Sequence, residues 1–424
     1  MPSSQAIFNK LKYSIEDVFH HHGFQAIETP IIDRTDILLA KAGGDTEKQI
    51  YKVVKTEEAA EDSDQALRFD HTVPLARYVT EHENDLAFPF RVTQIGRNFR
   101  GERAQKGRFR EFYQCDVDII GRGELPVAYD AEAIVTIYEA LKTFSLPDMK
   151  IRISNRKILA GFLSTLGLAE QTSAISSIID HAEKVPPEAT EQALKDLNLP
   201  AESVVKITTF MQINGSSEQI KAKLDDLGID NADFATGTQE LITVLDLLAQ
   251  KGLKDIAIGD LLIIRGLDYY TGTVFEVFLP EHRAIGAIAG GGRYENLASN
   301  FTDQKLPGVG GSIGLTRLFY VLNEHGLLAR TSTMPIDIAI IPISEKEYAY
   351  SFELAAKLRS GGQSVDIILT AKKLGDKLTH ASKIARGAIV IGENEATSNN
   401  IMIKNLSTGT LTSLDDYLTN TKRP

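Results

Sequence analysis

The order of strand-like and helix-like segments changes along the chain, and this change limits the folds that it can adopt. Strand-like runs without intervening helical patterns occupy 50–54, 66–69, 90–95 and 109–120. From Pro335 onward, strand-like runs at 336–343, 364–370 and 388–392 alternate with helical patterns at 345–359 and 374–386. Consecutive strands favour an antiparallel sheet, whereas alternation favours a parallel sheet with right-handed crossovers. We therefore predict an α+β protein whose C-terminal part is a separate α/β (βαβαβ) domain.

The remaining segments complete this prediction. Apolar residues at helical spacing predict helices at 4–20 and 130–144 and a helical insertion between roughly 170 and 250, where strand patterns vanish. The run GFQAIETPIID at 23–33 is typical of a strand that ends at Pro30, because proline cannot donate to a strand ladder. Further strands are predicted at 149–154, 261–264, 273–278 and 284–289.

Length and composition restrict the class of protein. A chain of 424 residues exceeds the size at which a single core usually stops growing, so we expect at least two domains. The single cysteine, Cys115, cannot form an internal disulfide, and neither a signal-peptide core nor a membrane span is apparent. These features indicate a cytoplasmic protein that does not enter membranes.

Charge is distributed in blocks. The net charge of −11 argues against nonspecific coating of nucleic acid. Residues 91–110, however, hold seven Lys or Arg against one Glu, a local charge of +6. Residues 171–240 carry 5 basic and 12 acidic side chains, and 331–424 carry 11 and 10. A strongly anionic ligand is therefore expected at 91–110, and phosphate contacts are expected to concentrate on selected faces.

Residues 91–121 are the first segment that points to chemistry. Two predicted strands flank a charged loop at 103–108, and alternation places Phe112, Gln114, Asp116 and Asp118 on one face. Arginines held on rigid strands suit a polyphosphate, since guanidinium groups offer planar, permanently charged forks. A solvated charged hairpin is the alternative interpretation of the same density of charge.

Three further segments combine glycine with polar or aromatic residues. They are RGLDYYTGTVFEVF at 265–278, AIAGGGRYENL at 287–297 and GVGGSIGLTRLFYVL at 308–322. Glycines around Tyr269 and Tyr270 let a ligand approach the backbone, although adjacent tyrosines are also typical of a core. Arg317 interrupts an apolar helical face, and a surface arginine flanked by core residues would give the same pattern.

Together these segments resemble the histidyl-tRNA synthetases, a family of class II aminoacyl-tRNA synthetases, from the first helix to the last strand. The run at 23–33 resembles motif 1, the hairpin at 91–121 motif 2, and GGSIGLTRL at 310–318 motif 3, which identify only the class. RGLDYYTGT at 265–273 and AGGGRYENL at 289–297 resemble the two signatures of the histidine enzymes. The resemblance implies a class II antiparallel sheet of six to seven strands with flanking helices.

The resemblance also implies roles for individual residues. For ATP, Arg100 would bind the α-phosphate, Glu102 would orient the adenine end, Arg108 would reach the γ-phosphate, and Phe112 and Arg317 would enclose adenine. For histidine, Asp70, Thr72 and Gln114 would receive the α-ammonium, and Asp118, Tyr269, Tyr270 and Tyr294 would surround the imidazole. Arg265 would approach the substrate carboxylate and the α-phosphate opposite Arg100, so that Arg100 and Arg265 are the expected catalytic residues.

The implied partners and domains follow from the same resemblance. Histidine, ATP with Mg²⁺, and tRNA-His are the expected ligands, no protein metal site is expected, and a homodimer would form through motif 1. The catalytic core would comprise 1–169 and 251–328, the helical insertion 170–250, and an anticodon-binding domain 333–424. Lys372, Lys373, Lys377 and Lys383 are candidate contacts to the tRNA backbone, although a solvated helix face would explain them equally well.

Some features leave alternatives open. One alternative is the regulatory subunit paralogue of ATP phosphoribosyltransferase, which binds ligand without aminoacylation, and another is a noncatalytic tRNA-sensing module of the kind fused to a kinase. Intact Arg100, Arg265 and Arg317, and the complete run at 335–411, argue against both. Asp70 and Asp118 stand where other branches of the family carry Glu, and His71 is unusual at its position. A structural, hydrogen-bonded histidine is the simplest interpretation of His71.

Overall fold

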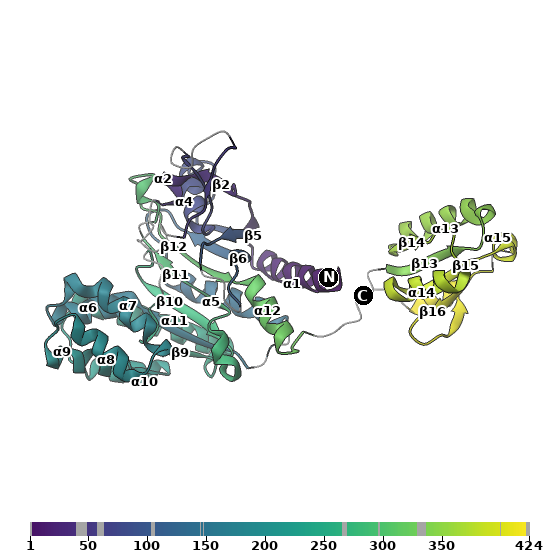
Figure 1. The fold of residues 1–424 in the computed structure, drawn as a ribbon. Coiled ribbons are helices and arrows are strands. Elements are labelled where there is room, and N and C mark those ends of the chain that lie inside the picture. Colours follow the sequence, from purple (N-terminus) through teal and green to yellow (C-terminus); the bar gives the residue numbers. More distant parts are fainter. Residues whose placement is uncertain are drawn as a thin grey trace. The chain divides into compact units, whose positions relative to one another are not determined.

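The computed structural model describes residues 2–39, 49–56, 63–102, 107–144, 146, 148–264, 269–295, 297–328, 336–398 and 400–420. The chain forms two compact units, which are Leu11–Leu328, and Ala329–Pro424 together with Met1–Lys10. Figure 1 shows the elements of each unit. Among the described residues, no helix combines the length and apolar character that crossing a membrane requires.

A nine-stranded sheet forms the centre of the larger unit (Figure 1). The strand order is β1-β5-β6-β12-β11-β10-β7-β9-β8, in which only β1–β5 and β7–β9 pair in parallel. The predicted antiparallel sheet is therefore confirmed, with two-residue strands added at both ends. The strands are β1 Gln25–Ala26, β5 Phe90–Phe99, β6 Glu111–Ile120, β7 Lys150–Asn155, β8 Asn214–Gly215, β9 Ala257–Asp260, β10 Thr273–Phe278, β11 Ala289–Tyr294 and β12 Gly308–Ile313.

Helices pack on this sheet, and a further group of helices lies next to it. Helix α5 packs on β12, α12 packs on β6, and α11 contacts both α5 and α6. In Figure 1 the helices between β7 and β9 form the teal group next to the sheet. The helices are α1 Pro2–His21, α5 Ala128–Lys142, α6 Arg156–Thr165, α7 Thr172–His181, α8 Pro187–Asp196, α9 Ala201–Phe210, α10 Ser217–Asp225, α11 Ala232–Leu248 and α12 Leu315–Glu324.

The segment 23–33 is only partly as predicted. The strand expected before Pro30 is present as Gln25–Ala26, which pair with β5, but a second strand, Ile32–Arg34 (β2), was not predicted and pairs with β4 in a separate three-stranded sheet. Pro30 lies between the two strands, where its missing N–H costs no ladder bond. The small sheet consists of β2, β3 Lys52–Val53 and β4 Gln65–Leu67, and two helices accompany it, α2 Thr35–Leu38 and α4 Thr72–Glu81.

Two further strands lie elsewhere than predicted. The strand expected at 261–264 is β9, Ala257–Asp260, and Leu261 and Leu262 form a turn after it. The strand expected at 284–289 is β11, Ala289–Tyr294, which contains the three glycines of AGGGRY. Apolar content gave the wrong position in both cases. For β11 the reason is that glycines which pack against a neighbouring strand carry no hydrophobic signal. At Gly291, an added Cβ would collide with the carbonyl oxygen of Gly310 on β12.

The C-terminal unit confirms the predicted α/β pattern. Its sheet has the order β14-β13-β15-β16-β17, in which β13 pairs in parallel with both β14 and β15. The antiparallel hairpin β16–β17 was not predicted. The elements are β13 Ile336–Pro342, α13 Tyr348–Ser360, β14 Val365–Ile367, α14 Leu374–Ile384, β15 Ala385–Ile391, α15 Glu393–Ser398, β16 Met402–Asn405, β17 Leu411–Ser413 and α16 Leu414–Asn420.

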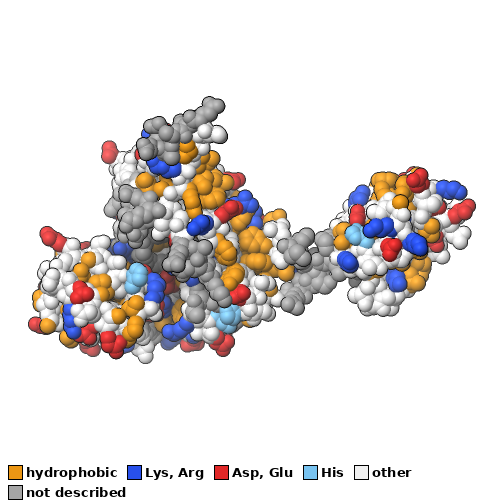
Figure 2. Space-filling model, in the orientation of Figure 1, with side chains coloured by type: hydrophobic (Ala, Val, Ile, Leu, Met, Phe, Trp, Pro, Cys, Tyr) orange, Lys and Arg blue, Asp and Glu red, His pale blue; other side chains and the backbone are white. Residues whose placement is uncertain are grey.

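Basic side chains of this unit differ in their exposure. On the face shown in Figure 2, Lys and Arg lie among acidic side chains over this unit. Lys372, Lys373 and Lys383 are exposed. Lys377 is buried and its Nζ donates to the backbone oxygen of Pro342 at 2.9 Å, so the prediction that it contacts a tRNA backbone is wrong.

A buried ion pair joins the sheet to the helix beneath it. Arg293 on β11 donates through Nη2 to Asp130 on α5 at 2.6 Å, and both side chains are almost fully buried. The Arg293 Nη1 also donates to the backbone oxygen of Leu125 at 3.0 Å. The arginine of AGGGRY is therefore a structural residue in this unit, and its guanidinium contacts groups that precede or lie on α5 and also Glu295, at 3.4 Å.

We predict that Asp130→Ala lowers the free energy of unfolding by about 3 to 5 kcal/mol, because it removes the buried counter-ion of Arg293 and leaves the guanidinium the longer ion pair with Glu295, at 3.4 Å. The matched control is Asp36→Ala, which removes an exposed partner of Arg34 and should cost less than about 1 kcal/mol. Urea unfolding of the two variants measures both values. Equal losses would show that the buried pair contributes no more than a surface pair.

Candidate active site

Three carboxylates gather on one face of the sheet. Asp116 and Asp118 lie two residues apart on β6, so their side chains point to the same face. Asp70 precedes α4, and its charge acts on Asp118, as does that of Asp116. All three side chains are buried. We call Asp70, Asp116 and Asp118 the carboxylate cluster.

Asp118 is the most perturbed member of the cluster. Its Oδ1 accepts a hydrogen bond from the hydroxyl of Tyr294 on β11 at 2.9 Å. Burial raises the pKa of Asp118 to about 8, the charge of Asp116 adds to the rise, and the Tyr294 hydroxyl opposes it. Glycines on β12 make room for this pair, since a Cβ at Gly310 would collide with Asp118 and a Cβ at Gly308 would collide with the Tyr294 ring.

Asp70 is fixed by the start of α4. Its Oδ1 accepts hydrogen bonds from the backbone N–H groups of Thr72 and Val73, each at 3.1 Å, as a helix-capping carboxylate does. Burial raises the pKa of Asp70, while the Val73 N–H and the charge of Arg100 oppose the rise. The effect of Arg100 places a cation within reach of the carboxylate cluster.

Three tyrosines stand beside these carboxylates. The rings of Tyr269 and Tyr270 meet edge to face at a centroid distance of 4.9 Å, and Tyr269 meets Tyr294 at 6.2 Å. The Tyr269 hydroxyl donates to Oγ1 of Thr72 at 3.4 Å. A Cβ at Gly292 would lie 2.8 Å from the Tyr270 ring, so glycine at this position lets the ring approach β11.

Gln114 continues the polar row of β6 beyond Asp116. It accepts from Nδ2 of Asn98 on β5 at 2.7 Å and donates to Oγ of Ser312 on β12 at 2.6 Å. Its amide therefore has a fixed orientation across three strands. Sequence reasoning singled out Gln114 but missed Asn98 and Ser312, which reach it only through the strand register.

Arginine and aromatic side chains lie at the other end of the row. The guanidinium of Arg100 stands 4.3 Å from the ring centroid of Phe69 and 5.1 Å from that of Phe112, and its Nε donates to the Phe69 oxygen at 3.3 Å. Arg108 and Glu102 form an ion pair at 3.2 Å. Arg100, held against two aromatic rings, is thus the cation whose charge acts on Asp70 of the carboxylate cluster.

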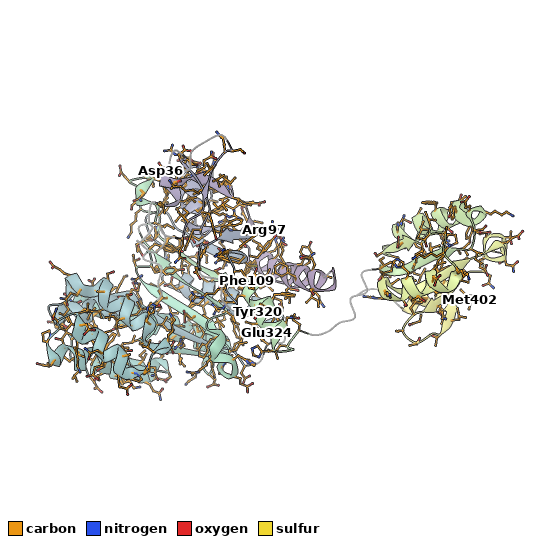
Figure 3. The ribbon with its side chains drawn as sticks, viewed as in Figure 1. Asp36, Arg97, Phe109, Tyr320, Glu324 and Met402 are labelled. Atoms are coloured by element: carbon orange, nitrogen blue, oxygen red, sulfur yellow. The ribbon has the colours of Figure 1, made fainter. Side chains whose placement is uncertain are left out.

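Arg317 on α12 approaches this end from a different part of the chain. A Cβ added at Gly286 would lie 2.9 Å from its Nη2, and one added at Gly107 would lie 3.7 Å from its Cγ. Gly107 belongs to the loop before β6. Phe109 from the same loop packs against Tyr320 on α12 at a centroid distance of 5.7 Å (Figure 3). The loop and α12 are therefore in contact.

A cavity of about 310 Å³ adjoins Tyr270, between the end of β7 and the helices that follow it. Its wall combines Ser154 to Lys157 with side chains of α7, α9 and α11, and with Tyr270 and Thr271. Arg265 lies outside the described residues, so its expected position opposite Arg100 is not part of this geometry.

The predicted residues therefore occupy two neighbouring groups. One group offers buried carboxylates, hydroxyls and an amide, which suit an ammonium and an imidazole. The other offers guanidinium groups and aromatic rings, which suit phosphates and a flat base. No group of three or more His, Cys, Asp or Glu side chains positioned for a metal ion occurs in the described part of the chain.

Comparisons with known proteins agree with this arrangement. The family model for histidyl-tRNA synthetase matches residues 1–318, and the model for an anticodon binding domain matches residues 337–416. The histidine–tRNA ligase of Clostridium tetani is 42% identical over 412 residues, which cover 96% of this chain and 92% of the relative. The histidine–tRNA ligase of Finegoldia magna is 42% identical over 411 residues, which cover 96% of this chain and 94% of the relative.

Solved structures give the same result. The crystal structure of histidyl-tRNA synthetase from Nostoc sp. PCC 7120 superposes with a TM-score of 0.87 at 36% identity, covering 99% of this chain and 96% of that one. A Bacillus halodurans structure, described as an ATP phosphoribosyltransferase regulatory subunit/histidyl-tRNA synthetase, has a TM-score of 0.74 at 22% identity over 91% and 94% of the chains. The latter shows the fold alone.

We predict that Asp118→Asn makes the protein more stable at pH 8. The unfolded chain loses the Asp118 proton near the ordinary aspartate pKa of 3.8, whereas the folded chain, in which burial raises this pKa to about 8, keeps the proton to higher pH. The contribution of Asp118 is therefore lost as pH rises through this window, by up to about 1.4 kcal/mol per pH unit. Urea unfolding at pH 5 and pH 8 measures the change.

The matched control for this prediction is Asp226→Asn, which changes an exposed aspartate. Its stability relative to the unmodified protein should be the same at both pH values. A difference between the unmodified protein and Asp118→Asn that does not grow with pH would show that Asp118 ionises normally in the folded state.

Proposed function

The chain belongs to the histidyl-tRNA synthetase family, and we propose that the carboxylate cluster and the arginines beside it form the site where histidine meets ATP. The protein is a histidine–tRNA ligase, which activates histidine with ATP and transfers it to the 3′ end of tRNA-His. The observation that carries the site proposal is the buried pair of Asp118 and Tyr294, which lies beside a row of polar groups that leads to Arg100.

Histidine would bind at the carboxylate end. Asp70, Thr72 and Gln114 receive the α-ammonium, which offers three N–H donors. Asp118 accepts the N–H of the imidazole and so selects one tautomer of the ring. The tyrosine rings of Tyr269, Tyr270 and Tyr294 enclose the imidazole and limit its size. A ligand without a ring N–H could not donate to Asp118, which is the physical basis of selection for histidine.

ATP would bind at the arginine end. Arg100 contacts the α-phosphate, Arg108 reaches the γ-phosphate, and Glu102, which pairs with Arg108, orients the adenine end. Phe112 and Arg317 enclose the base. Arg265, by resemblance, approaches the α-phosphate and the substrate carboxylate from the side opposite Arg100.

The reaction needs no nucleophile from the protein. The histidine carboxylate attacks the α-phosphorus of ATP in line, the bond to pyrophosphate breaks, and histidyl-adenylate forms. Both reactants are anions, and negative charge moves onto the leaving pyrophosphate. Fixed guanidinium groups therefore stabilise the transition state more than the ground state. In the second step a ribose hydroxyl at the tRNA 3′ end attacks the activated carbonyl and releases AMP.

Mg²⁺ would accompany ATP. Magnesium commonly binds substrate phosphates together with one or two carboxylates, rather than a cage built by the protein alone. Glu102 is a carboxylate at the arginine end that can serve in this way. The role of Mg²⁺ here would be to neutralise phosphate charge.

The domain organisation is proposed as follows. Residues 1–169 and 251–328 form the catalytic core, 170–250 a helical insertion, and 333–424 the anticodon-binding domain, which agrees with the family match over 337–416. The exposed lysines Lys372, Lys373 and Lys383 are suited to phosphate contacts. By resemblance, the protein forms a homodimer through 23–33 and works in the cytoplasm.

We predict that Arg100→Ala lowers the rate of histidine-dependent ATP–pyrophosphate exchange by roughly 10²- to 10³-fold, because one fixed cation at the α-phosphate is lost. Arg97→Ala is the matched control, since Arg97 lies on β5, three residues before Arg100, but is exposed and pairs with Glu111. It should change the rate little. Arg265→Ala should lose exchange as Arg100→Ala does.

Near-normal exchange by a folded Arg100→Ala protein would remove Arg100 from the catalytic residues. The same result for Arg265→Ala would remove the role that the resemblance assigns to Arg265. Circular dichroism and thermal unfolding of each variant distinguish a loss of function from a loss of fold.

We predict that ending the chain after Arg330 leaves histidyl-adenylate formation intact and raises the KM for tRNA by on the order of tenfold or more. The anticodon contacts are lost, while the residues proposed to bind histidine and ATP remain. Exchange and aminoacylation assays on the same preparation measure the two effects. Unchanged charging kinetics would contradict the anticodon-binding assignment of the C-terminal unit.

A further inference from the structure

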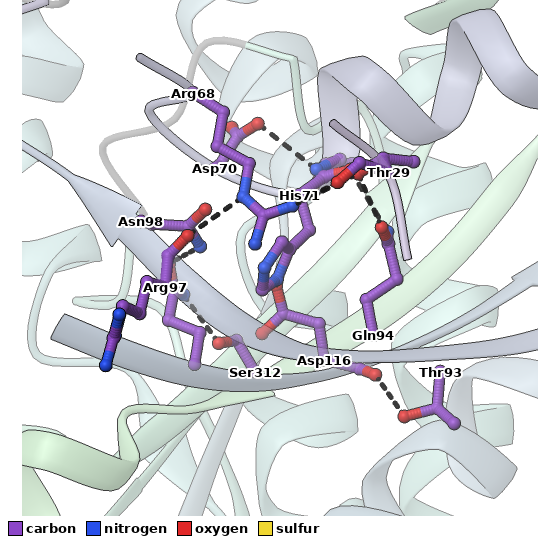
Figure 4. Close-up of polar contacts among 12 residues, drawn as sticks. Thr29, Arg68, Asp70, His71, Thr93, Gln94, Arg97, Asn98, Asp116 and Ser312 are labelled. Atoms are coloured by element: carbon purple, nitrogen blue, oxygen red, sulfur yellow. Dashed lines mark hydrogen bonds and ion pairs between the residues drawn. The ribbon is translucent and has the colours of Figure 1, made fainter. Parts of the chain in front are cut away.

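His71 is a fully buried histidine that is not among the residues assigned to substrate. It immediately precedes α4, next to Asp70, and its imidazole is completely shielded from solvent. Its Nδ1 lies 2.7 Å from Oδ2 of Asp116. Figure 4 shows the ring between Asp116 on one side and Arg68 on the other. A histidine in such a position acts on the carboxylate cluster directly.

The surroundings of the ring determine its protonation pattern. Because Asp116 accepts at Nδ1, this nitrogen carries a proton. Nε2 has no hydrogen-bond partner among the described residues. Nε2 and Nη2 of Arg68 both approach Gly96: a Cβ added at this glycine would lie 3.1 Å from Nε2 and 2.5 Å from Nη2. A tautomer with the proton on Nδ1 fits this contact with Asp116.

Arg68 is itself held in place by neutral groups. Its Nε donates to the backbone oxygen of Arg97 at 2.8 Å and its Nη1 to that of Thr29 at 2.6 Å. Gln94 donates to the backbone oxygen of His71 at 3.2 Å and accepts from the Thr29 hydroxyl at 2.8 Å. The ring of His71 is therefore fixed from several elements, and Asp116 is the carboxylate that it contacts.

Asp116 connects this group to the proposed histidine site. It lies on the same face of β6 as Asp118, and Oδ1, its second carboxylate oxygen, is buried without a hydrogen-bond partner among the described residues. With only one oxygen hydrogen-bonded, the negative charge of Asp116 is stabilised by the proton that His71 donates, and the charge of Arg68 also acts on it. Removing a hydrogen-bond donor makes the charged form of a buried carboxylate less favourable.

We propose that His71 is a positioning residue at the proposed histidine site: by donating to Asp116, it keeps a negative charge next to Asp118, and so confines acceptance of the substrate imidazole by Asp118 to higher pH. This proposal rests on the function proposed above for Asp118. Through Asp116, His71 sets the pH range in which Asp118 can accept the imidazole N–H. His71 itself does not touch the substrate.

The charges that act on Asp118 support this proposal. After burial, the charge of Asp116 is the second cause that raises the pKa of Asp118 to about 8, and Asp70 adds a smaller effect from the segment before α4. From β11, Tyr294 donates to Asp118 and opposes the rise. Asp118 in turn acts on Tyr269. If Asp116 lost its charge, Asp118 would ionise at lower pH.

The consequence is a measurable pH dependence. An imidazole N–H donates well to Asp118 only when this carboxylate is ionised. The kcat/KM for histidine should therefore rise with pH through a midpoint near the value of Asp118. The ionisations of free histidine contribute equally in every variant, so differences between variants report on the protein.

The test measures kcat/KM for histidine by pyrophosphate exchange between pH 6 and 9. His71→Leu and Asp116→Asn should each shift the midpoint to lower pH by about one unit or more. The double variant should shift it no further than Asp116→Asn alone, because both changes remove the same charge. His71→Gln, whose amide can donate to Asp116, should restore the midpoint of the unmodified protein.

His22→Leu is the matched control. His22 also contacts a carboxylate, Glu139 at 2.8 Å, but it lies outside the carboxylate cluster, so its removal should leave the midpoint unchanged. Thermal unfolding establishes that each variant is folded. Asp116→Asn keeps the shape of the aspartate, and His71→Gln keeps a hydrogen-bond donor to Asp116. These two variants therefore provide the test even if His71→Leu does not fold.

The possible results separate the proposals. Unshifted midpoints in folded His71→Leu and Asp116→Asn, or additive shifts in the double variant, overturn the role of His71 while leaving Asp118 in its role. Normal exchange and normal selectivity for histidine in Asp118→Asn overturn the proposed role of Asp118 instead. A shift in both single variants, absent in His71→Gln, supports the proposal.

Discussion

Burying several carboxylates close together is the physical constraint on which the site depends. Asp70, Asp116 and Asp118 are removed from water, and each charge makes the next one less favourable. The protein meets this cost in three different ways. Backbone N–H groups hold Asp70, a histidine holds Asp116, and burial raises the pKa of Asp118 to about 8. The proposed substrate, histidine, would bring hydrogen-bond donors and a positive charge to this cluster.

Glycine makes this arrangement sterically possible. Gly308, Gly310 and Gly292 on neighbouring strands lie where side chains would collide with Tyr294, Asp118 and Tyr270. The same absence of side chains explains why the sequence analysis misplaced β11, whose three glycines give no apolar pattern. The signature AGGGRY was recognised by resemblance, but its arginine proved to be a structural partner of Asp130. A motif identified a family correctly without identifying the role of each of its residues.

The parts of the fold with regular patterns were predictable. Helices α1 and α5, strands β6 and β10, and the alternation in the C-terminal unit follow from periodicity alone. The segment 23–33 was only partly predictable, because it divides between two sheets and the choice depends on partners distant in sequence. For the same reason Asn98, Ser312 and the pairing of His71 with Asp116 could not be predicted. Strand register brings these residues together, and no local pattern encodes it.

The most direct test of the central claim is ATP–pyrophosphate exchange by the purified protein with each of the twenty amino acids in turn. We expect histidine to support exchange and the other nineteen to remain at background, because Asp118 and the surrounding tyrosines fit a flat ring that donates an N–H. Exchange with a different amino acid, or none with histidine in a folded protein, would contradict the assignment of this site.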